Sequence, residues 1–242
     1  MRVAAEKAIQ LDPLLPEAHD ALGMGYAQGG QWEQSESSFR RAIELGPGRS
    51  ESYRHYATFL LLPLGRIEES LRQLRVAEKA DPLSTAARFY LAYVLISAGR
   101  FDEAADLCEK QPADFEGKPM LLGRARLGQG RTQEAIQILE TAIHRGVKPG
   151  NEIWGALGFA YAWAGRREEA EKLAVEMPSR NPFNQALTFA GLGDKDRTLE
   201  ALDRAAAAGP FKMGRVLTFP ELSLLQGDPR LKALRKKVGL PE

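Results

Sequence analysis

The residue types that most often do chemistry are few in this chain and lie far apart. There is one cysteine, Cys108, and there are three histidines, His19, His55 and His144. A catalytic nucleophile needs an adjacent base, and a metal ion needs several converging ligands. The spacing of these residues gives no such grouping, so we expect neither a catalytic residue nor a metal site.

Two acidic pairs and two glycine-rich strings could still suggest acid–base or phosphate chemistry. Glu68-Glu69 and Glu168-Glu169 each follow a glycine closely, where we expect helices to begin. Carboxylates in a first helical turn interact favourably with the helix dipole, which explains them without acid–base catalysis. The strings at 23–27 and 128–130 lack the preceding strand that a phosphate-binding loop requires. We therefore expect a protein that is not an enzyme and binds no cofactor.

Composition and charge exclude further classes of protein. The 242 residues are 44% hydrophobic and 27% charged, as is typical of a folded protein, and the formal net charge is +1. The basic run at 230–237 has no interleaved aromatic residues, so we interpret it as a solvated helix face rather than a nucleic-acid site. There is no run of 18 apolar residues and no signal-peptide pattern. We expect a cytoplasmic protein without direct nucleic-acid or membrane contact.

Glycines recur along the chain at intervals of 28 to 35 residues. They are Gly30, Gly65, Gly99, Gly130, Gly165 and Gly193. The residue five positions after each glycine is small: Ser35, Ser70, Ala104, Ala135, Ala170 and Thr198. The position nine residues after each glycine is mostly apolar and is occupied once by Cys108, so we expect that thiol to be buried.

These offsets predict a helix, a glycine turn and a second helix in every repeat. Glycine suits the turn because it tolerates a positive φ after a helix, and small residues suit places where two helices cross closely. Pro13, Pro47 and Pro82 end three of the second helices. We expect at least ten helices in antiparallel pairs and no sheet.

The repeats resemble those of the tetratricopeptide repeat (TPR) family. The clearest units are AHDALGMGYAQGGQWEQSESSFRRAIELGP and IWGALGFAYAWAGRREEAEKLA, and the second holds Trp154, Leu157, Gly158, Tyr161 and Gly165 in the family's order. The resemblance implies an all-α fold, a right-handed solenoid of antiparallel helix pairs that forms a TPR-like superhelix.

The resemblance also divides the chain. Residues 1–15 resemble the second helix of a truncated preceding repeat, so we expect a piece of a longer protein. Residues 16–210 form the TPR-like repeats, and residues 211–242 form a helical capping tail. Three features depart from the pattern. The second repeat needs one inserted residue near 61–63, Pro112 should shorten a second helix, and Arg126 stands at an apolar position.

The tail resembles the terminal element of TPR arrays in bacterial signalling and transcription regulators. In it, Asp228 and Pro229 should begin a helix whose apolar residues cover the last repeat. This resemblance implies a protein–protein interaction module, the C-terminal regulatory region of a larger bacterial protein. The alternative is a stand-alone TPR scaffold or assembly factor in secretion or envelope biogenesis.

In a TPR-like solenoid the first helices line the concave surface, and we expect a protein or peptide partner to bind there. The residues that we assign to this surface are large aromatics and arginines, the types enriched at binding hot spots. They are Arg54, Phe89, Tyr93, Arg124, Phe159 and Trp163. A packing role for the aromatic residues is the alternative. The unpaired N-terminal helix also makes a weak homo-oligomer possible.

Overall fold

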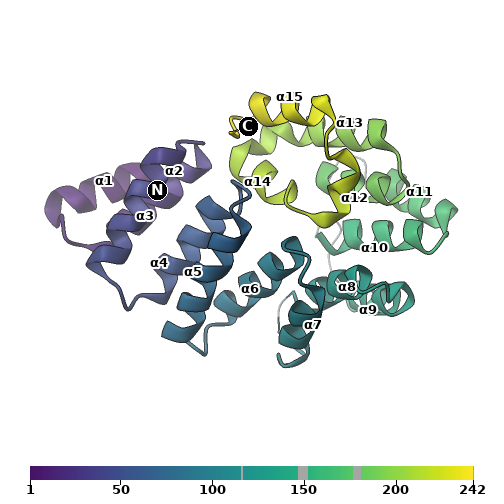
Figure 1. Ribbon diagram of the computed structural model, residues 1–242, viewed down its shortest axis with the longest axis horizontal. Coiled ribbons are helices and arrows are strands. Elements are labelled where there is room, and N and C mark those ends of the chain that lie inside the picture. Colours follow the sequence, from purple (N-terminus) through teal and green to yellow (C-terminus); the bar gives the residue numbers. More distant parts are fainter. Residues whose placement is uncertain (116, 147–151, 177–180, 242) are drawn as a thin grey trace. The chain divides into compact units, whose positions relative to one another are not determined.

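The computed structural model describes residues 1–115, 117–146, 152–176 and 181–241. Within these residues the chain is all-α, with fifteen α-helices and no strand, as predicted. The helices form two compact units (Figure 1). Unit 1 comprises residues 1–94, 208–218 and 238–242, and unit 2 comprises residues 95–207 and 219–237. The C-terminal segment, residues 208–242, therefore contributes to both units: its two ends belong to unit 1 and its middle, residues 219–237, belongs to unit 2.

Unit 1 is built from the N-terminal repeats and one helix of the C-terminal segment. Helix α2 packs on α3, and α4 with the π-helix η1 packs on α5. The helices are α1 (Arg2–Leu11), α2 (Pro16–Gln28), α3 (Trp32–Leu45), α4 (Ser50–His55), η1 (Tyr56–Leu61), α5 (Ile67–Ala80) and α14 (Gly209–Val216). Helix α6 (Thr85–Ser97) lies in unit 1 up to Val94.

Unit 2 holds three further pairs, α8 with α9, α10 with α11 and α12 with α13, which Figure 1 colours from teal to yellow-green. The helices are α7 (Phe101–Glu109), α8 (Lys118–Gly128), α9 (Thr132–His144), α10 (Glu152–Trp163), α11 (Arg167–Glu176), α12 (Pro182–Gly191), α13 (Lys195–Ala205), the 3-10 helix η3 (Pro220–Leu225) and α15 (Pro229–Lys237). The 3-10 turn η2 (Ala206–Ala208) follows α13.

All six repeat glycines end a helix in the left-handed conformation, with φ between 71° and 75°. After each glycine, the next residue donates its backbone N–H to a carbonyl five residues earlier, as Arg100 does to Leu95 at 2.9 Å. This is the hydrogen bond of a Schellman turn. The predicted helix–glycine–helix unit is therefore correct at every repeat.

Small residues allow the two helices of a pair to approach closely. All six small residues that follow the turn glycines are fully buried. A Cβ added at Gly123 of α8 would lie 2.7 Å from Cδ2 of Leu139 on α9. The hydroxyl of Ser35 on α3 donates to the carbonyl of Gly23 on α2 at 2.8 Å. A larger side chain at these positions would separate the helices.

The inserted residue of the second repeat is absorbed by a π-helix. Residues Tyr56–Leu61 adopt this wider helix, and the N–H of Leu62 donates to the carbonyl of Ala57 five residues earlier at 2.9 Å. A π-helical turn accommodates one extra residue without ending the helix. The following Gly65 therefore keeps the turn geometry of the other repeats.

The other two departures also have a structural basis. Helix α7 ends at Glu109, three residues before Pro112, so it has only nine residues. Arg126 is buried at its apolar position, where its guanidinium pairs with Glu109 and donates to Oε1 of Gln129 at 2.7 Å. The carboxylate of Glu109 neutralises the buried charge, and the amide oxygen of Gln129 accepts a further hydrogen bond from it.

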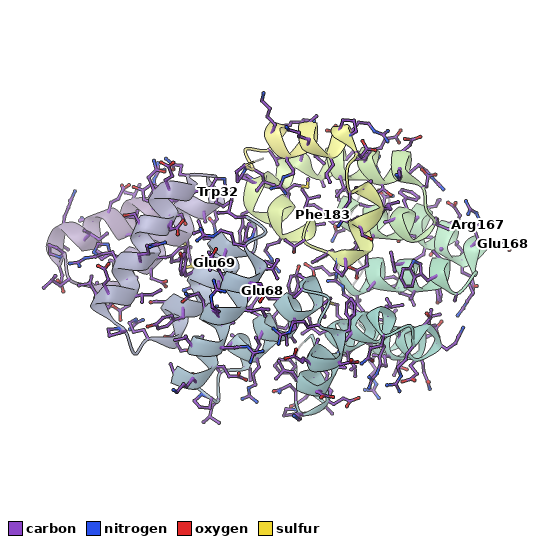
Figure 2. All side chains as sticks on the ribbon, in the orientation of Figure 1. Trp32, Glu68, Glu69, Arg167, Glu168 and Phe183 are labelled. Atoms are coloured by element: carbon purple, nitrogen blue, oxygen red, sulfur yellow. The ribbon has the colours of Figure 1, made fainter. Side chains whose placement is uncertain are left out.

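The arginine that follows four of the glycines forms an ion pair at the start of the next helix. Each arginine binds the glutamate three residues later, in the pairs Arg66–Glu69, Arg100–Glu103, Arg131–Glu134 and Arg166–Glu169. Figure 2 labels Glu68 and Glu69 at the start of α5, and Arg167 and Glu168 at the start of α11. Arg66 lowers the pKa of Glu69, as Arg166 does for Glu169, so these carboxylates are charged partners of arginine.

The tail begins its last helix as predicted. Helix α15 starts at Pro229, and the side chain of Asp228 accepts the N–H of Arg230 at 2.9 Å. In Figure 1, α15 runs alongside α13. Arg230 and Lys237 pair with Asp196 and Asp203 of α13, both at 2.6 Å.

Replacing Ala135 by tryptophan tests the close crossing of α8 and α9. Ala135 is fully buried, so the larger side chain should overpack the pair and reduce the free energy of unfolding by about 1–3 kcal/mol. Urea denaturation followed by circular dichroism measures this. Gln137→Trp, on the exposed side of α9, is the control and should change stability little. Equal effects at both positions would contradict the assigned helix face.

Hydrogen bonds to the carboxylate of Glu36 join the first two repeats. Glu36 accepts hydrogen bonds from Arg66 and Arg40 at 2.8 Å and from the Tyr56 hydroxyl at 2.9 Å. Burial alone would raise the pKa of Glu36, but the hydrogen bonds from these three residues outweigh it and lower the pKa from 4.5 to about 2. Because the folded protein favours the ionised form, Glu36 stabilises the fold above about pH 4.5, and this is lost as pH falls towards 2.

Glu36→Gln should therefore destabilise the protein by about 1–2 kcal/mol at pH 7, a value reduced for partial solvent exposure. The difference in unfolding free energy between wild type and variant should shrink as pH falls from 5 to about 2. Denaturant unfolding at several pH values measures this difference. Exposed Glu51→Gln is the control, and a pH-independent difference for Glu36→Gln would show that the ionised form is not the stabilising one.

Candidate functional site

The surface formed by the first helices of the pairs is the candidate binding surface in each unit. In unit 1 these helices are α2, α4 with η1, and α6, and in unit 2 they are α8, α10 and α12. We call each surface the first-helix face of its unit.

The first-helix face of unit 1 is covered by α14 of the same chain. Helix α14 contacts α2, and the Phe211 ring stacks on the Phe59 ring of η1 with centroids 4.8 Å apart and planes 8° apart. A Cβ added at Gly214 would lie 2.4 Å from the carbonyl oxygen of Pro63. Helix α14 therefore lies against this face with backbone contact at Gly214.

The aromatic residues of α6 are also covered from this side. The guanidinium of Arg215 on α14 lies 5.0 Å from the ring centroid of Tyr93 and 5.8 Å from that of Tyr90, which are cation–π distances. Tyr93 is buried, whereas Phe89 is half-buried and packs edge-on against Tyr90. Of the predicted aromatic pair on α6, Phe89 is therefore the more accessible.

Arg54 belongs to a short polar chain on the same face. It donates to Nε2 of His55 at 2.9 Å, and Nδ1 of His55 lies 2.5 Å from Oδ2 of Asp20 on α2. A guanidinium can only donate, so Nε2 accepts and Nδ1 carries the proton that His55 donates to Asp20. This chain joins α4 to α2 beside the stacked Phe59 ring, which lies edge-on to His55 with centroids 5.8 Å apart.

The first-helix face of unit 2 is occupied by η3. Helix η3 contacts α12, and its Glu221 forms a two-bond ion pair with Arg124 of α8, with Nε–Oε1 at 2.6 Å and Nη2–Oε2 at 2.7 Å. The side chains of Arg124 and Glu221 are only 2% and 7% exposed. The ring centroid of Phe219 lies 3.8 Å from the same guanidinium.

The local sequence explains the shape of this occupying segment. Phe219 is extended, with ψ at 127°, and Pro220 follows at the first position of η3, where its fixed φ suits a helix start. Leu222 and Leu225 are buried, three residues apart on one side of the short helix. Gly227, with φ at 79°, then ends the segment before α15.

Phe159 and Trp163 of α10 form the second predicted aromatic pair. Their ring centroids lie 4.8 Å apart. Phe159 is buried, but Trp163 is 56% exposed. Trp163 is therefore the most accessible of the predicted site residues on unit 2, where Arg124 is already paired.

The cysteine thiol, in the described part of the chain, lies in the core. Cys108 is buried, and burial raises the pKa of its thiol to about 12, so it is not a nucleophile at neutral pH. Among the described residues, no three His, Cys, Asp or Glu side chains gather as metal ligands. No described helix combines the length and the apolar character needed to cross a bilayer.

Comparison with known proteins assigns the family. Three tetratricopeptide repeat models match residues 18–51, 60–116 and 126–188. The chain belongs to the tetratricopeptide repeat family. The matched ranges contain four of the six predicted site residues and exclude the tail. Arg54 lies between the first two ranges, and Arg124 lies between the last two.

Two solved structures are similar over most of the chain. A TPR protein from Parabacteroides merdae has a TM-score of 0.70 and 12% identity, with 98% of this chain and 90% of that chain covered. The type IV pilus biogenesis factor PilW has a TM-score of 0.62 and 17% identity, with 87% and 97% covered. At these identities the likeness shows the fold alone.

One curated relative is much longer than this chain. The CTR9 homolog of Arabidopsis thaliana is 28% identical over 229 residues, which are 89% of this chain and 20% of that protein. The chain therefore spans about a fifth of the length of the curated relative that it matches.

The TPR pattern did not reveal the residues that cover the two faces. Phe211, Arg215, Phe219 and Glu221 lie outside the repeat pattern, within the tail that we expected to cap the last repeat. The string Phe219-Pro220-Glu221-Leu222 does carry a signal, because an aromatic residue, a helix-starting proline and a lone carboxylate stand together in an apolar run. Its partner Arg124, 97 residues away, cannot be read from it.

A double-mutant cycle on Arg124 and Glu221 tests this ion pair. Arg124→Met or Glu221→Gln leaves one buried partner uncompensated, so each should cost about 3–5 kcal/mol of unfolding free energy, and the double variant should cost less than their sum. Urea denaturation measures all three. The exposed pair Arg100–Glu103 is the matched control, with a coupling of about 1 kcal/mol or less. Additive losses at Arg124 and Glu221 would show that the two do not interact in solution.

Proposed function

We propose that this TPR chain is a protein-interaction module that binds segments of a partner protein on its first-helix faces. One observation carries the proposal. Each face already holds a protein segment through contacts of the kind that a partner would use. These are an aromatic stack on Phe59, a cation–π contact at Tyr93 and a carboxylate on Arg124.

The accessible residues indicate where a partner would first make contact. Trp163 exposes a large aromatic surface beside buried Phe159, and Arg54 and Phe89 are half-buried. Tryptophan and arginine are the commonest anchors of protein interfaces. We therefore propose Trp163 as the main exposed contact of unit 2, with Arg54 and Phe89 as contacts of unit 1.

We further propose a regulatory rather than a catalytic role, within a larger protein of the cytoplasm. A module whose binding faces are covered by its own tail suits regulation, which favours this reading over a stand-alone assembly factor. Direct nucleic-acid binding is not part of the proposal, since Arg230 and Lys237 of the basic tail are paired with aspartates of α13. A weak homo-oligomer is part of it, because α1 exposes Val3 and Leu11.

Photo-crosslinking from position 163 tests whether a partner protein binds next to Trp163. Trp163 is replaced by p-benzoylphenylalanine, and the cross-linked proteins are identified by mass spectrometry. We expect defined partners at position 163, because the aromatic side chain there is 56% exposed. The matched control places the same group at Val175 of α11, which is 69% exposed. The same proteins from both positions, or none from position 163, would contradict a partner site on α10.

A further inference from the structure

The segment on the first-helix face of unit 2 has the features of a bound peptide. Its Glu221 carboxylate receives two parallel hydrogen bonds from Arg124, at 2.6 and 2.7 Å. The geometry of such a pair is specific, because the planar guanidinium matches a carboxylate and orients it. Phe219 lies 3.8 Å from the same group, so one arginine recognises an aromatic ring and, two residues later, a carboxylate.

The apolar contacts extend this pattern to a motif. Leu222 and Leu225 are buried, while Ser223 between them is exposed. The residues that contact Arg124 are Phe219 and Glu221, and the two buried leucines extend the order of side chains to Phe-x-Glu-Leu-x-x-Leu. A peptide with this order of side chains presents the same contacts.

The segment is also a short element that is separate from the helix pairs. It forms a 3-10 helix of six residues, a geometry with weaker hydrogen bonds than an α-helix. It begins after extended Phe219 and ends before Gly227, whose φ is 79°. None of the helix pairs of unit 2 includes it, so its departure would leave each pair with its own turn and crossing contacts.

We propose that the first-helix face of unit 2 is a binding site for partner peptides of the pattern Phe-x-Glu-Leu-x-x-Leu, and that residues 219–226 are its built-in competitor. This inference rests on the proposed function. The competitor is tethered, so its effective concentration is on the order of millimolar. A free peptide at micromolar concentration therefore binds only when the tethered segment is weakened or when the partner offers further contacts.

The test uses the full chain and a fluorescein-labelled peptide of residues 217–226 (LTFPELSLLQ) in an anisotropy titration. The variant carries Phe219→Ala and Glu221→Gln, which weaken the tethered segment and leave the face intact. We expect its affinity for the peptide to be at least tenfold higher than that of wild type. Adding Arg124→Met to this variant, or glutamine in place of the peptide's glutamate, should remove at least tenfold of that affinity.

Matched controls separate displacement from general loosening. Ser223→Ala alters an exposed side chain of the same segment and should leave peptide binding as weak as in wild type. Circular dichroism and melting temperature establish that each variant is folded. If the double variant does not fold, Glu221→Gln alone replaces it. A chain that unfolds with either change would show that the segment is part of the core, and the proposal would be overturned.

The outcome is distinguishable from that of the proposed function. A folded variant that fails to gain peptide binding, or gains it equally with Arg124→Met, overturns the motif and the competitor. Cross-linking of partners at position 163 would then still support a partner site on unit 2. Gain of binding that requires both Arg124 and the peptide's glutamate supports the motif, whatever position 163 reports.

Discussion

The close approach of two helices within each repeat is the constraint on which the rest of the structure depends. A left-handed glycine reverses the chain, and small residues let the second helix lie almost against the backbone of the first, as Leu139 does at Gly123. Once the pairs are packed in this way, larger side chains of the first helices, such as Phe59 and Tyr93, are covered from their other side by α14. The same helix thus has one side that packs against its pair and another side that the C-terminal segment covers.

The buried pair of Arg124 and Glu221 has a different significance. Removing two charges from water costs several kcal/mol, which their attraction offsets only with good geometry. The two short parallel bonds supply that geometry. Because a one-residue shift of η3 would leave both charges buried and unpaired, the pair determines the register in which the segment lies.

Departures from the repeat pattern show how packing resolves local conflicts. The extra residue of the second repeat is taken up as a π-helix over Tyr56–Leu61, within which Leu60 and Leu61 are fully buried. Arg126 keeps its charge at an apolar position because α7 ends nearby and brings Glu109 within reach. Each solution uses a partner or a turn from a neighbouring element rather than a change of fold.

The sequence by itself determined the all-α class, the six glycine turns, the buried small residues and the start of α15. All of these depend on contacts within a repeat or on backbone preferences of single residues, which recur visibly along the chain. Only the tertiary structure decided what covers the first-helix faces. The contacts between Phe59 and Phe211 and between Arg124 and Glu221 join residues about 100 or more positions apart. Each of these contacts occurs only once, so the repeat pattern does not predict it. The contacts form only when the C-terminal segment packs on the earlier helices of its unit.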